Sequence, residues 1–550
     1  MPKVRLSLAQ INPTVGDISA NTADIMASCA KAAAEGADIV VFGEMSVTGY
    51  PIEDLATRET FVLRAEGATE QLAKDLLASG LGDLMVVVGH PSLAPKNLQN
   101  GWAIAQNCAS VLLGGRVVGK YAKHHLPNYS VFDEYRNFVP GDELLVVEHL
   151  GLKIAIVICE DIWQTGGPVA QISERGADVT LVLNGSPFEI DKDDRRLELV
   201  RILAKKHSTT TAYVNLIGGQ DDLVFDGDSI VVDANGEVIG RSYQFENDLL
   251  SVDIERNSAT LASAHPLVKK DDNWQIWNAL VLGLRDYVSK NGFKSVVLGL
   301  SGGIDSAVCA VIAADAIGAE NVYGISMPSV YSSDHSKSDA QDLAERIGCH
   351  YYTVPIEPMV QSFESELQFS GLASENLQAR VRGVILMGLS NQFGHLTLTT
   401  GNKTELAVGY STIYGDSVGG FAPIKDVEKT LVWQLARWRN EQSTNEGNIA
   451  PIPENSISKP PSAELRPGQV DQDSLPEYDI LDSILEHYVG KRASAQSIID
   501  AGFDAETVRR IVALVDRAEW KRRQGAIGPK ITGMAFGRDR RLPITNKNKE

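Results

Sequence analysis

Three chemically capable residues stand beside apolar runs in the first half of the chain. Glu44 follows residues 39–43, IVVFG, and Cys159 follows residues 154–158, IAIVI, whereas Lys123 lies in YAKHHLPNY. Because α/β folds build their sites beyond the carboxyl ends of strands, we expect the three side chains to meet. A cysteine attacks as the thiolate, which requires a base and a cationic neighbour. Glu44 would take the proton and Lys123 would stabilise the thiolate and then the oxyanion, which predicts covalent acyl transfer.

The stretch 298–308, LGLSGGIDSAV, predicts a phosphate site. An apolar run with β-branched residues precedes it and an alanine-rich helical pattern follows, so its middle is a strand-to-helix turn. Gly302 and Gly303 let the backbone bend tightly and approach a ligand, and the N-terminus of the following helix favours phosphate. The turn lacks the GxxxxGKS or GxxxxGKT pattern of a Walker loop. Asp305 would hold the Mg²⁺ that accompanies a nucleotide.

The sequence around the first three residues resembles a known family. GEMSVTGYP surrounds Glu44, YAKHHLPNYSVFDE surrounds Lys123 and CEDIW begins at Cys159. Together they resemble the Glu–Lys–Cys amidases of the nitrilase superfamily over about residues 3–250. The resemblance implies an N-terminal four-layer α-β-β-α sandwich. It also implies that Tyr129, with Ser186 and Lys192 of LVLNGSPFEIDK, binds glutamine.

The second half resembles another family. The SGGxDS turn is similar to the pyrophosphate loop of enzymes that adenylate a carboxylate, and ENLQAR, TTGNKTELAVGY and FGRDRRLPIT are similar to NAD synthetase. The resemblance implies that Glu405 lies by Mg²⁺, with Asp305, and by deamido-NAD, which Asn376 and Lys521 would also contact. The residues implied in ATP binding are Gly299, Leu300, Ser301, Gly302, Gly303, Ile304, Asp305, Ser306 and Thr400.

Short apolar runs alternate with helical patterns, which predicts two α/β domains. We expect an amidase domain at 1–256, a linker at 257–272, and a domain at 273–550 with a mostly parallel sheet and the pyrophosphate-binding loop. Expected strands are 4–9, 38–42, 84–89, 153–158, 179–183, 212–216, 295–300, 322–327 and 350–354. Expected helices are 21–34, 61–77, 195–207, 274–289 and 338–347. Residues 396–405 are expected to run from a strand into a polar turn.

Two segments of the second half leave alternatives open. Residues 441–476 are rich in Pro, Ser, Asn and Gly, which predicts a long mobile loop. The resemblance makes it a lid, but a plain flexible connector has the same composition. The last 30 residues hold a basic cluster together with apolar residues such as Phe536. We expect this tail to fold back over a dinucleotide rather than to extend as a free arm.

Composition narrows the class of protein. A formal net charge of −20 argues against a general nucleic-acid or membrane-surface binder. No run of 18 or more apolar residues and no signal peptide is evident, so we expect a cytoplasmic protein. The five cysteines lack metal-ligand or CxxC spacing, which argues against a zinc site or a disulfide scaffold. We also expect a homo-oligomer.

The two halves together predict a glutamine-dependent amidation, and the whole chain resembles the glutamine-dependent NAD synthetases. The implied reaction is deamido-NAD, ATP, glutamine and water giving NAD⁺, AMP, pyrophosphate and glutamate, with Mg²⁺ as cofactor. The first alternative is glutamine-dependent amidation of another adenylated acceptor. The second is a nucleotide-binding regulator without catalysis, although all three amidase residues are present.

Overall fold

The computed structural model describes residues 3–255, 258–262, 265 and 270–548. The chain divides into two compact units, Met1–Gln220 with Val224–Lys270 and Asp221–Leu223 with Asp271–Glu550. Of the predicted first domain and linker, residues 1, 2, 256, 257, 263, 264 and 266–269 lie outside the described residues. A strand, Ser258–Leu261, forms within the predicted linker, because Ala259 is buried against the core and Leu261 packs beside it.

The first unit contains two large sheets, of seven and six strands. The first has the order β15 (Ser258–Leu261), β14 (Asp248–Glu255), β1 (Val4–Gln10), β2 (Ile39–Phe42), β3 (Met85–Leu93), β4 (Ala105–Leu113) and β5 (Arg116–Ala122). The second has the order β13 (Val238–Arg241), β12 (Ile230–Val232), β9 (Thr210–Asn215), β8 (Val179–Asn184), β7 (Leu152–Ile158) and β6 (Leu145–His149). A two-stranded ribbon, β10 (Ile217–Gln220) and β11 (Leu223–Asp226), completes the strands.

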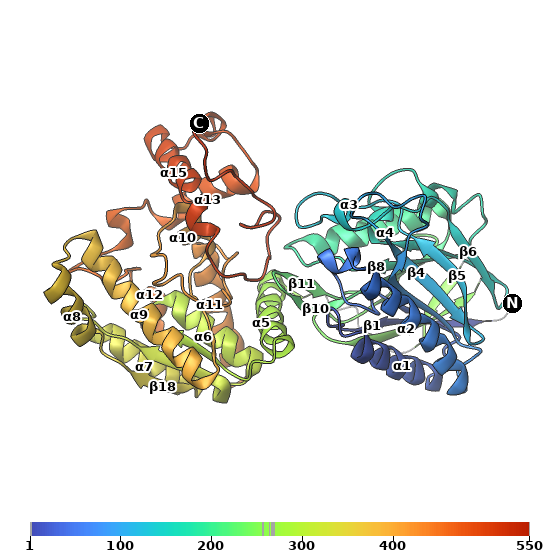
Figure 1. The fold of residues 1–550 in the computed structure, drawn as a ribbon, viewed down its shortest axis with the longest axis horizontal. Coiled ribbons are helices and arrows are strands. Elements are labelled where there is room, and N and C mark those ends of the chain that lie inside the picture. The colour runs from blue at the N-terminus through green and yellow to red at the C-terminus, as the bar shows by residue number, and fades with distance from the viewer. Residues whose placement is uncertain (1–2, 256–257, 263–264, 266–269, 549–550) are drawn as a thin grey trace. The chain divides into compact units, whose positions relative to one another are not determined.

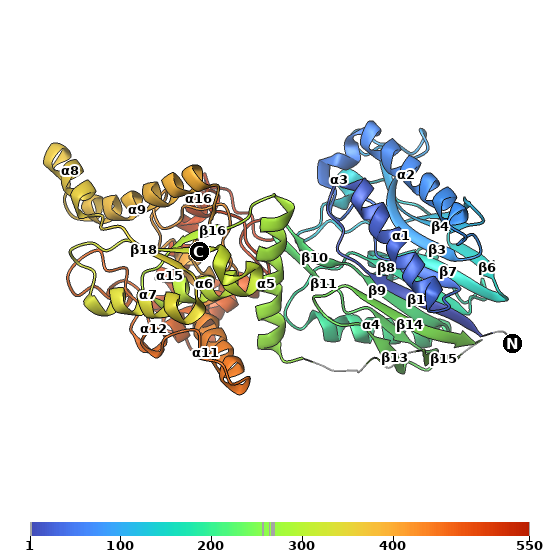
Figure 2. The same cartoon turned by 90° about the horizontal axis from the view of Figure 1, so that it is seen from below.

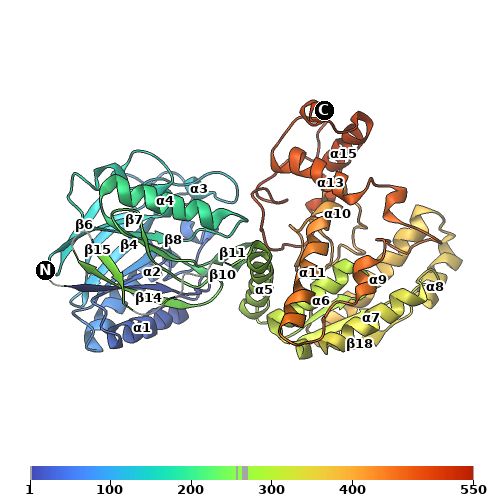
Figure 3. The ribbon, with the colours of Figure 1, turned by 180° about the vertical axis from the view of Figure 1, so that it is seen from behind.

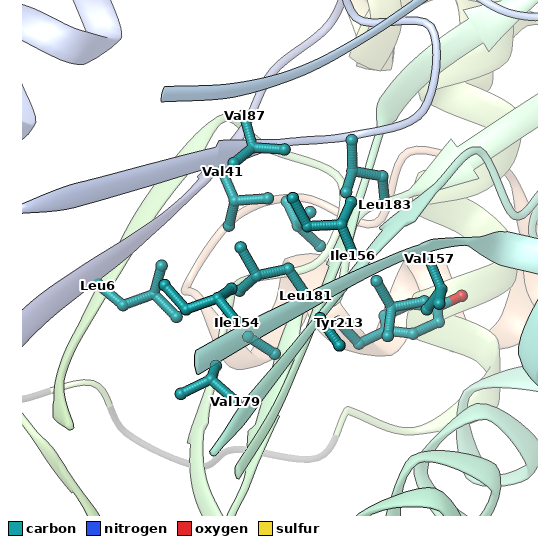
Figure 4. Packing of buried hydrophobic residues seen from close by; sticks show 14 of the residues in the cluster. Leu6, Val41, Val87, Ile154, Ile156, Val157, Val179, Leu181, Leu183 and Tyr213 are labelled. Carbon is teal, nitrogen blue, oxygen red and sulfur yellow. The ribbon is translucent and has the colours of Figure 1, made fainter. Parts of the chain in front are cut away.

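The core of this unit lies between the two sheets. Leu6, Val41 and Val87, from neighbouring strands of the first sheet, face Ile154 and Leu181 of the second (Figure 4). All five side chains are fully buried. Burying each side chain of this size contributes about 1.5–3 kcal/mol, so the apolar runs of the sequence stabilise the contact between the two sheets.

Helices cover the outer faces of both sheets (Figures 1 and 2). Helices α1 (Ile18–Ala34) and α2 (Glu59–Ala78) lie over the first sheet, and α4 (Lys192–His207) lies over the second, against β9 and β12. A short helix, α3 (Glu134–Asn137), lies in the connection after β5. The layers therefore run helix, sheet, sheet, helix, and the predicted α-β-β-α sandwich is confirmed.

The second unit is built on a parallel sheet in the order β18 (His350–Thr353), β17 (Val322–Ser326), β16 (Val296–Gly299) and β19 (Leu396–Thr397). Helices α6 (Ile304–Ile317) and α7 (Asp334–Ile347) cover one face and α9 (Leu372–Phe393) covers the other (Figure 2). This arrangement confirms the predicted parallel α/β domain. The other helices are α5 (Asp272–Lys290), α8 (Glu357–Leu367), α10 (Lys403–Val408), α11 (Lys429–Asn445), α12 (Glu454–Ser458), α13 (Tyr478–Leu485), α14 (Ala495–Asp500), α15 (Ala505–Arg517) and α16 (Glu519–Arg522).

A cluster of short helices closes this unit. Helices α13 and α15 pack against each other and against α10 (Figure 3). The chain that follows α16 also packs here, because Met534 and Phe536 are buried in the same apolar cluster and the Arg522 guanidinium lies 4.5 Å from the Phe536 ring. Among the described residues, no helix combines the length and the hydropathy that a membrane span requires.

Two helices begin where the sequence suggested a turn or a later start. Helix α7 begins at Asp334 rather than near residue 338, because the Ser333 side chain accepts the main-chain N–H of Ser336 and caps it. Helix α10 begins at Lys403, inside the predicted polar turn. Asn402 and Glu405 there form a reciprocal capping box, so the polar residues that suggested a turn start a helix instead.

The close approach of β3 to the segment that carries Glu44 depends on Gly89. A Cβ atom at Gly89 would lie 2.3 Å from the main-chain nitrogen of Met45. We therefore expect Gly89→Ala to destabilise the first unit by about 1–3 kcal/mol, measured by urea unfolding. The control is Gly67→Ala, because Gly67 lies in α2, where a Cβ atom would meet no neighbouring atom within 4 Å, and a helical alanine is favoured by about 1 kcal/mol. Equal unfolding midpoints for the two variants would contradict this packing argument.

Candidate functional site

Glu44 is a fully buried acid whose two carboxylate oxygens are both held. Strand β2 ends at Phe42, and the Glu44 side chain, two residues later, is fully buried. Its Oε1 accepts from Lys123 Nζ at 2.7 Å and from Asn107 Nδ2 at 2.6 Å, and its Oε2 accepts from the main-chain N–H of Gly185 at 2.9 Å. Hydrogen bonds from a cation and a main-chain amide stabilise an ionised carboxylate and fix its direction.

Cys159 follows β7 directly and lies in a tight 3₁₀ turn, Cys159–Ile162. Its backbone φ is +40°, in the left-handed region that a side chain of this type rarely adopts. Asp161 builds the turn, because its Oδ2 accepts from the N–H of Ile158 and from the hydroxyl of Tyr121. Since Tyr121 lies two residues before Lys123, this carboxylate ties the turn that carries the thiol to the strand that leads to the lysine.

Lys123 is buried between two carboxylates. Its Nζ lies 2.7 Å from Glu44 Oε1 and 2.9 Å from Glu134 Oε1. The Tyr50 hydroxyl donates to the same Glu134 oxygen at 2.8 Å. Lys123 is 1% exposed, so its charge is compensated almost entirely by these two acids. The predicted trio is therefore a cluster of four charged or nucleophilic groups.

The environment raises the pKa values of Lys123, Glu134 and Cys159, for different reasons. Burial alone would lower the pKa of Lys123, but Glu134 and Glu44 raise it well above its usual value. Burial raises the pKa of Glu134 to about 7, against the effect of Lys123. Burial and the charge of Glu44 raise the pKa of Cys159 well above 9, although Lys123 acts to lower it. The cysteine of this structure is therefore a neutral thiol at pH 7, beside an acid that can receive its proton.

Two of the three predicted glutamine ligands lie close to this cluster. The Tyr129 hydroxyl donates to Glu160, the residue after Cys159, at 2.9 Å. Ser186 follows Gly185, which donates to Glu44, and its hydroxyl accepts from Arg196 Nε at 3.2 Å. Lys192 begins α4 and lies 3.6 Å from Glu189.

The phosphate loop joins β16 to α6 as the sequence predicts. Gly302 has φ +77°, and a Cβ atom there would lie 2.3 Å from the main-chain oxygen of Ser336. Only glycine fits both the conformation and the contact with α7. The Ser306 hydroxyl donates to the Gly303 carbonyl, so the loop is closed onto the first turn of α6 by its own serine.

Asp305 and Glu405, the predicted metal ligands, converge from α6 and α10. Asp305 Oδ2 accepts from Lys429 Nζ, which also lies 3.4 Å from Glu405 Oε1. Asn402 Nδ2 donates to Asp305 Oδ1 at 3.0 Å, and the Asn402 main-chain N–H faces Glu405 Oε2 at 3.4 Å. Burial and the charge of Asp305 raise the pKa of Glu405 to about 8. Two carboxylates that share one buried cation are a donor set suited to Mg²⁺.

A cavity of about 660 Å³ opens above the phosphate loop. Of the predicted ligands of the second unit, all but Gly302 line it, and its size suits nucleotide-sized substrates. Asn376 accepts from the Thr412 hydroxyl at 2.8 Å, and Lys521 donates to the carbonyls of Gly409 and Ser411, both at 2.7 Å. The predicted residues that line it are Gly299, Leu300, Ser301, Gly303, Ile304, Asp305, Ser306, Asn376, Thr400, Glu405 and Lys521.

The predicted mobile loop 441–476 lines the same cavity. Glu464 accepts from the hydroxyls of Ser333 and Ser336, at 3.0 and 2.7 Å, and from Lys459 Nζ at 3.1 Å. The Ser456 hydroxyl donates to the carbonyl of Gly302 at 3.1 Å. In this structure the segment therefore contacts both the phosphate loop and the start of α7.

Comparison with known proteins accounts for both units. The family model of carbon–nitrogen hydrolases matches residues 5–264, and that of NAD synthases matches residues 276–525. The glutamine-dependent NAD(+) synthetase of Acinetobacter baylyi is 45% identical over 99% of each chain. That of Thermotoga maritima is 41% identical over 100% of each chain. The chain belongs to the glutamine-dependent NAD⁺ synthetases.

Solved structures agree with this membership. The glutamine-dependent NAD⁺ synthetase of Acinetobacter baumannii, in complex with ADP, is 42% identical, with a TM-score of 0.78 over 99% of each chain. That of Cytophaga hutchinsonii is 23% identical and shares the fold, with a TM-score of 0.83 over 99% of this chain and 98% of its own.

Three residues that contact the site were not predicted from the sequence. Glu134 is the last residue of the YAKHHLPNYSVFDE stretch, and the only feature of the sequence that indicates a role for it is its place in that stretch. Asn107 lies within β4 and faces Glu44. Lys429 begins α11, 124 residues after its partner Asp305. For the last two residues, no local pattern reveals the contact.

The raised pKa of Cys159 predicts how the free thiol reacts. Iodoacetamide alkylates the thiolate, so its rate at Cys159 should keep rising with pH through pH 9, because the pKa lies well above 9. The measurement is peptide-resolved mass spectrometry across a pH series, with Cys159→Ser identifying the peptide. A rate at Cys159 that levels off near pH 7 would contradict the neutral thiol.

Proposed function

We propose that this chain makes NAD⁺ from deamido-NAD, ATP and glutamine, as a carbon–nitrogen ligase. The observation that carries the proposal is that one chain contains both a thiol beside a buried acid–lysine cluster and a cavity lined by a phosphate loop. The first releases nitrogen from an amide, and the second activates the acid that receives it. Family membership supports the same assignment.

Glutamine hydrolysis begins at Cys159. Glu44 takes the thiol proton, and the thiolate attacks the side-chain carbonyl carbon of glutamine. Lys123, fixed between its two carboxylates, directs its charge at the oxyanion that forms. Glu44 then passes the proton to the leaving nitrogen, ammonia departs and a glutamyl thioester remains. We assign glutamine binding to Tyr129, Ser186 and Lys192.

The same acid completes the cycle. Glu44, again ionised, takes a proton from a water molecule that attacks the thioester carbonyl carbon. The C–S bond breaks, glutamate leaves and the proton returns to the thiol. Because burial and Glu44 favour the neutral thiol, Cys159 is a good acceptor of this proton once the product has formed.

Activation of deamido-NAD takes place in the cavity of the second unit. A carboxylate oxygen of deamido-NAD attacks the α-phosphorus of ATP, and pyrophosphate leaves into the loop formed by residues 299–306. Ammonia then attacks the carbonyl carbon of the acyl adenylate, and AMP leaves. Thr400 would contact ATP, whereas Asn376, Glu405 and Lys521 would hold deamido-NAD at the cavity wall.

We assign Mg²⁺ to Asp305 and Glu405, since their oxygens converge and hard cations prefer oxygen ligands. When bound, the metal would offset the charge of the phosphates and of the departing pyrophosphate. Among the described residues, no group of three or more acidic, histidine or cysteine side chains is arranged to hold a metal ion. Phosphate oxygens and water would therefore complete the coordination.

The acceptor, the assembly and the location are part of the proposal. We assign a homo-oligomer in the cytoplasm. We also assign no nucleic-acid or membrane partners, in accordance with the strongly negative net charge. Incubation with glutamine, ATP, Mg²⁺ and a panel of acid acceptors tests the acceptor, with AMP and NAD⁺ as the products expected. Amidation of a different acid would favour another glutamine-dependent ligase, and absence of ammonia release would favour a nucleotide-binding regulator.

Cys159→Ala should separate the two reactions. Without the nucleophile, NAD⁺ formation from glutamine should fall by at least about a thousandfold, whereas formation from ammonium salts should persist. The matched control is Cys108→Ala, which removes another buried thiol from β4. Loss of the ammonia-dependent reaction in Cys159→Ala alone would mean that one site serves both steps.

Asp305→Ala should impair the other reaction. Loss of one carboxylate of the proposed metal pair should lower NAD⁺ formation from either nitrogen source by at least about tenfold, while glutamate release continues. Asp315→Ala, on the same helix but paired with Arg439, serves as the control. Normal NAD⁺ formation by Asp305→Ala would remove Asp305 from the metal site.

A further inference from the structure

Lys429 takes a position that the proposed function gives to a metal. Its ammonium contacts Asp305 Oδ2 and lies 3.4 Å from Glu405 Oε1, and the whole side chain is 1% exposed. The lysine is the first residue of α11, and its main-chain N–H donates to the Thr404 hydroxyl at 2.9 Å, which fixes the start of this helix beside α10.

The two carboxylates divide their oxygens in the same way. Each has one oxygen near Asn402: Asp305 Oδ1 lies 3.0 Å from the side-chain nitrogen, and Glu405 Oε2 lies 3.4 Å from the main-chain nitrogen. Each directs its other oxygen at Lys429. Asn402 would therefore keep both carboxylates in place if the ammonium moved away. The two oxygens then left free converge on one point, as the oxygen ligands of a divalent cation do.

Aromatic rings offer the ammonium a second place to lie. Lys429 Nζ is 5.6 Å from the centre of the Trp433 ring and 5.4 Å from that of Tyr478. Ring faces attract cations, the more so when water is excluded. The Tyr478 hydroxyl donates to Asp471 at 2.7 Å, and this buried acid lies in the 441–476 segment and adds negative charge near Lys429. The ammonium can thus leave the carboxylates and remain buried with a compensating charge.

We propose that Lys429 is an internal counter-cation that excludes divalent metal from Asp305 and Glu405 until a nucleotide arrives. This inference rests on the proposed function of the second unit. The pair supplies only two free oxygens, so a metal alone gains too little to expel a buried ammonium and lose its own water. A nucleotide brings phosphate oxygens that ligate the same metal, and their negative charge tips the exchange. Metal and nucleotide would then bind together.

Mn²⁺ is a suitable probe, because the free ion gives an electron paramagnetic resonance signal that bound ions lose. We expect the full-length protein alone to bind Mn²⁺ weakly. When a non-hydrolysable ATP analogue is present, the protein should bind Mn²⁺ at least tenfold more tightly than the analogue alone does. Lys429→Met, which keeps the length of the side chain but removes its charge, should bind Mn²⁺ without nucleotide about tenfold or more tightly than the wild type. Lys429→Arg should bind as weakly as the wild type.

Controls separate this effect from general damage. Lys530→Met removes another lysine that is buried and ion-paired, with Asp539 at 3.0 Å, and should leave Mn²⁺ binding unchanged. Asp305→Asn combined with Lys429→Met should lose the gained affinity, which assigns it to this carboxylate pair. Circular dichroism checks that each variant is folded. If Lys429→Met does not fold, Mn²⁺ binding by the wild-type protein with and without the ATP analogue decides the question.

Two results would overturn the inference. One is tight Mn²⁺ binding by the wild-type protein without nucleotide that Asp305→Asn abolishes. The other is a folded Lys429→Met protein that binds Mn²⁺ no better than the wild type. Neither measurement involves glutamine, deamido-NAD or NAD⁺, so failure of this inference leaves the proposed reaction standing, and a different acceptor would leave the Mn²⁺ result readable.

Discussion

Each half of this chain is organised around one buried lysine held between two carboxylates. Lys123 lies between Glu44 and Glu134, and Lys429 contacts Asp305 and faces Glu405. Removing a charge from water costs several kcal/mol, and removing one member of such a group leaves the others uncompensated. The positions of these side chains are therefore tightly coupled, and the strands and helices that carry them are fixed relative to one another within each unit.

The two lysines differ in what else surrounds them. Around Lys123, the oxygens of Glu44 are also held by Asn107 and a main-chain amide, and Glu134 is held by Tyr50. Such a network keeps a charge stationary, as stabilisation of an oxyanion requires. The carboxylates beside Lys429 are also held, by Asn402, but Lys429 has in addition aromatic rings beside it, which accept a cation without a directional hydrogen bond. This environment tolerates movement of the ammonium and suits a site where cations enter and leave.

The sequence predicts the parts of the fold that local pattern controls. Buried runs such as 179–183 and the SGGxDS turn have strong signals, because burial selects apolar residues and a phosphate turn needs glycine. The same logic locates Glu44 and Cys159 beyond strand ends. Strand β5 (Arg116–Ala122) lies at a sheet edge, and its sequence, RVVGKYA, contains a glycine and two charged residues, which weakens its signal. The partners of the site residues follow from tertiary packing, which no short window of sequence contains.

Two of the three residues that escaped prediction share a location. Glu134 is the first residue of α3 and Lys429 is the first residue of α11, whereas Glu44 and Cys159 follow strands. An acid at a helix N-terminus agrees with the helix dipole, so Glu134 looks like an ordinary start of a helix. A lysine at that position opposes the dipole and is locally unfavourable. Because Lys429 nevertheless lies there, fully buried, its place is explained by the two carboxylates it faces and not by its own helix.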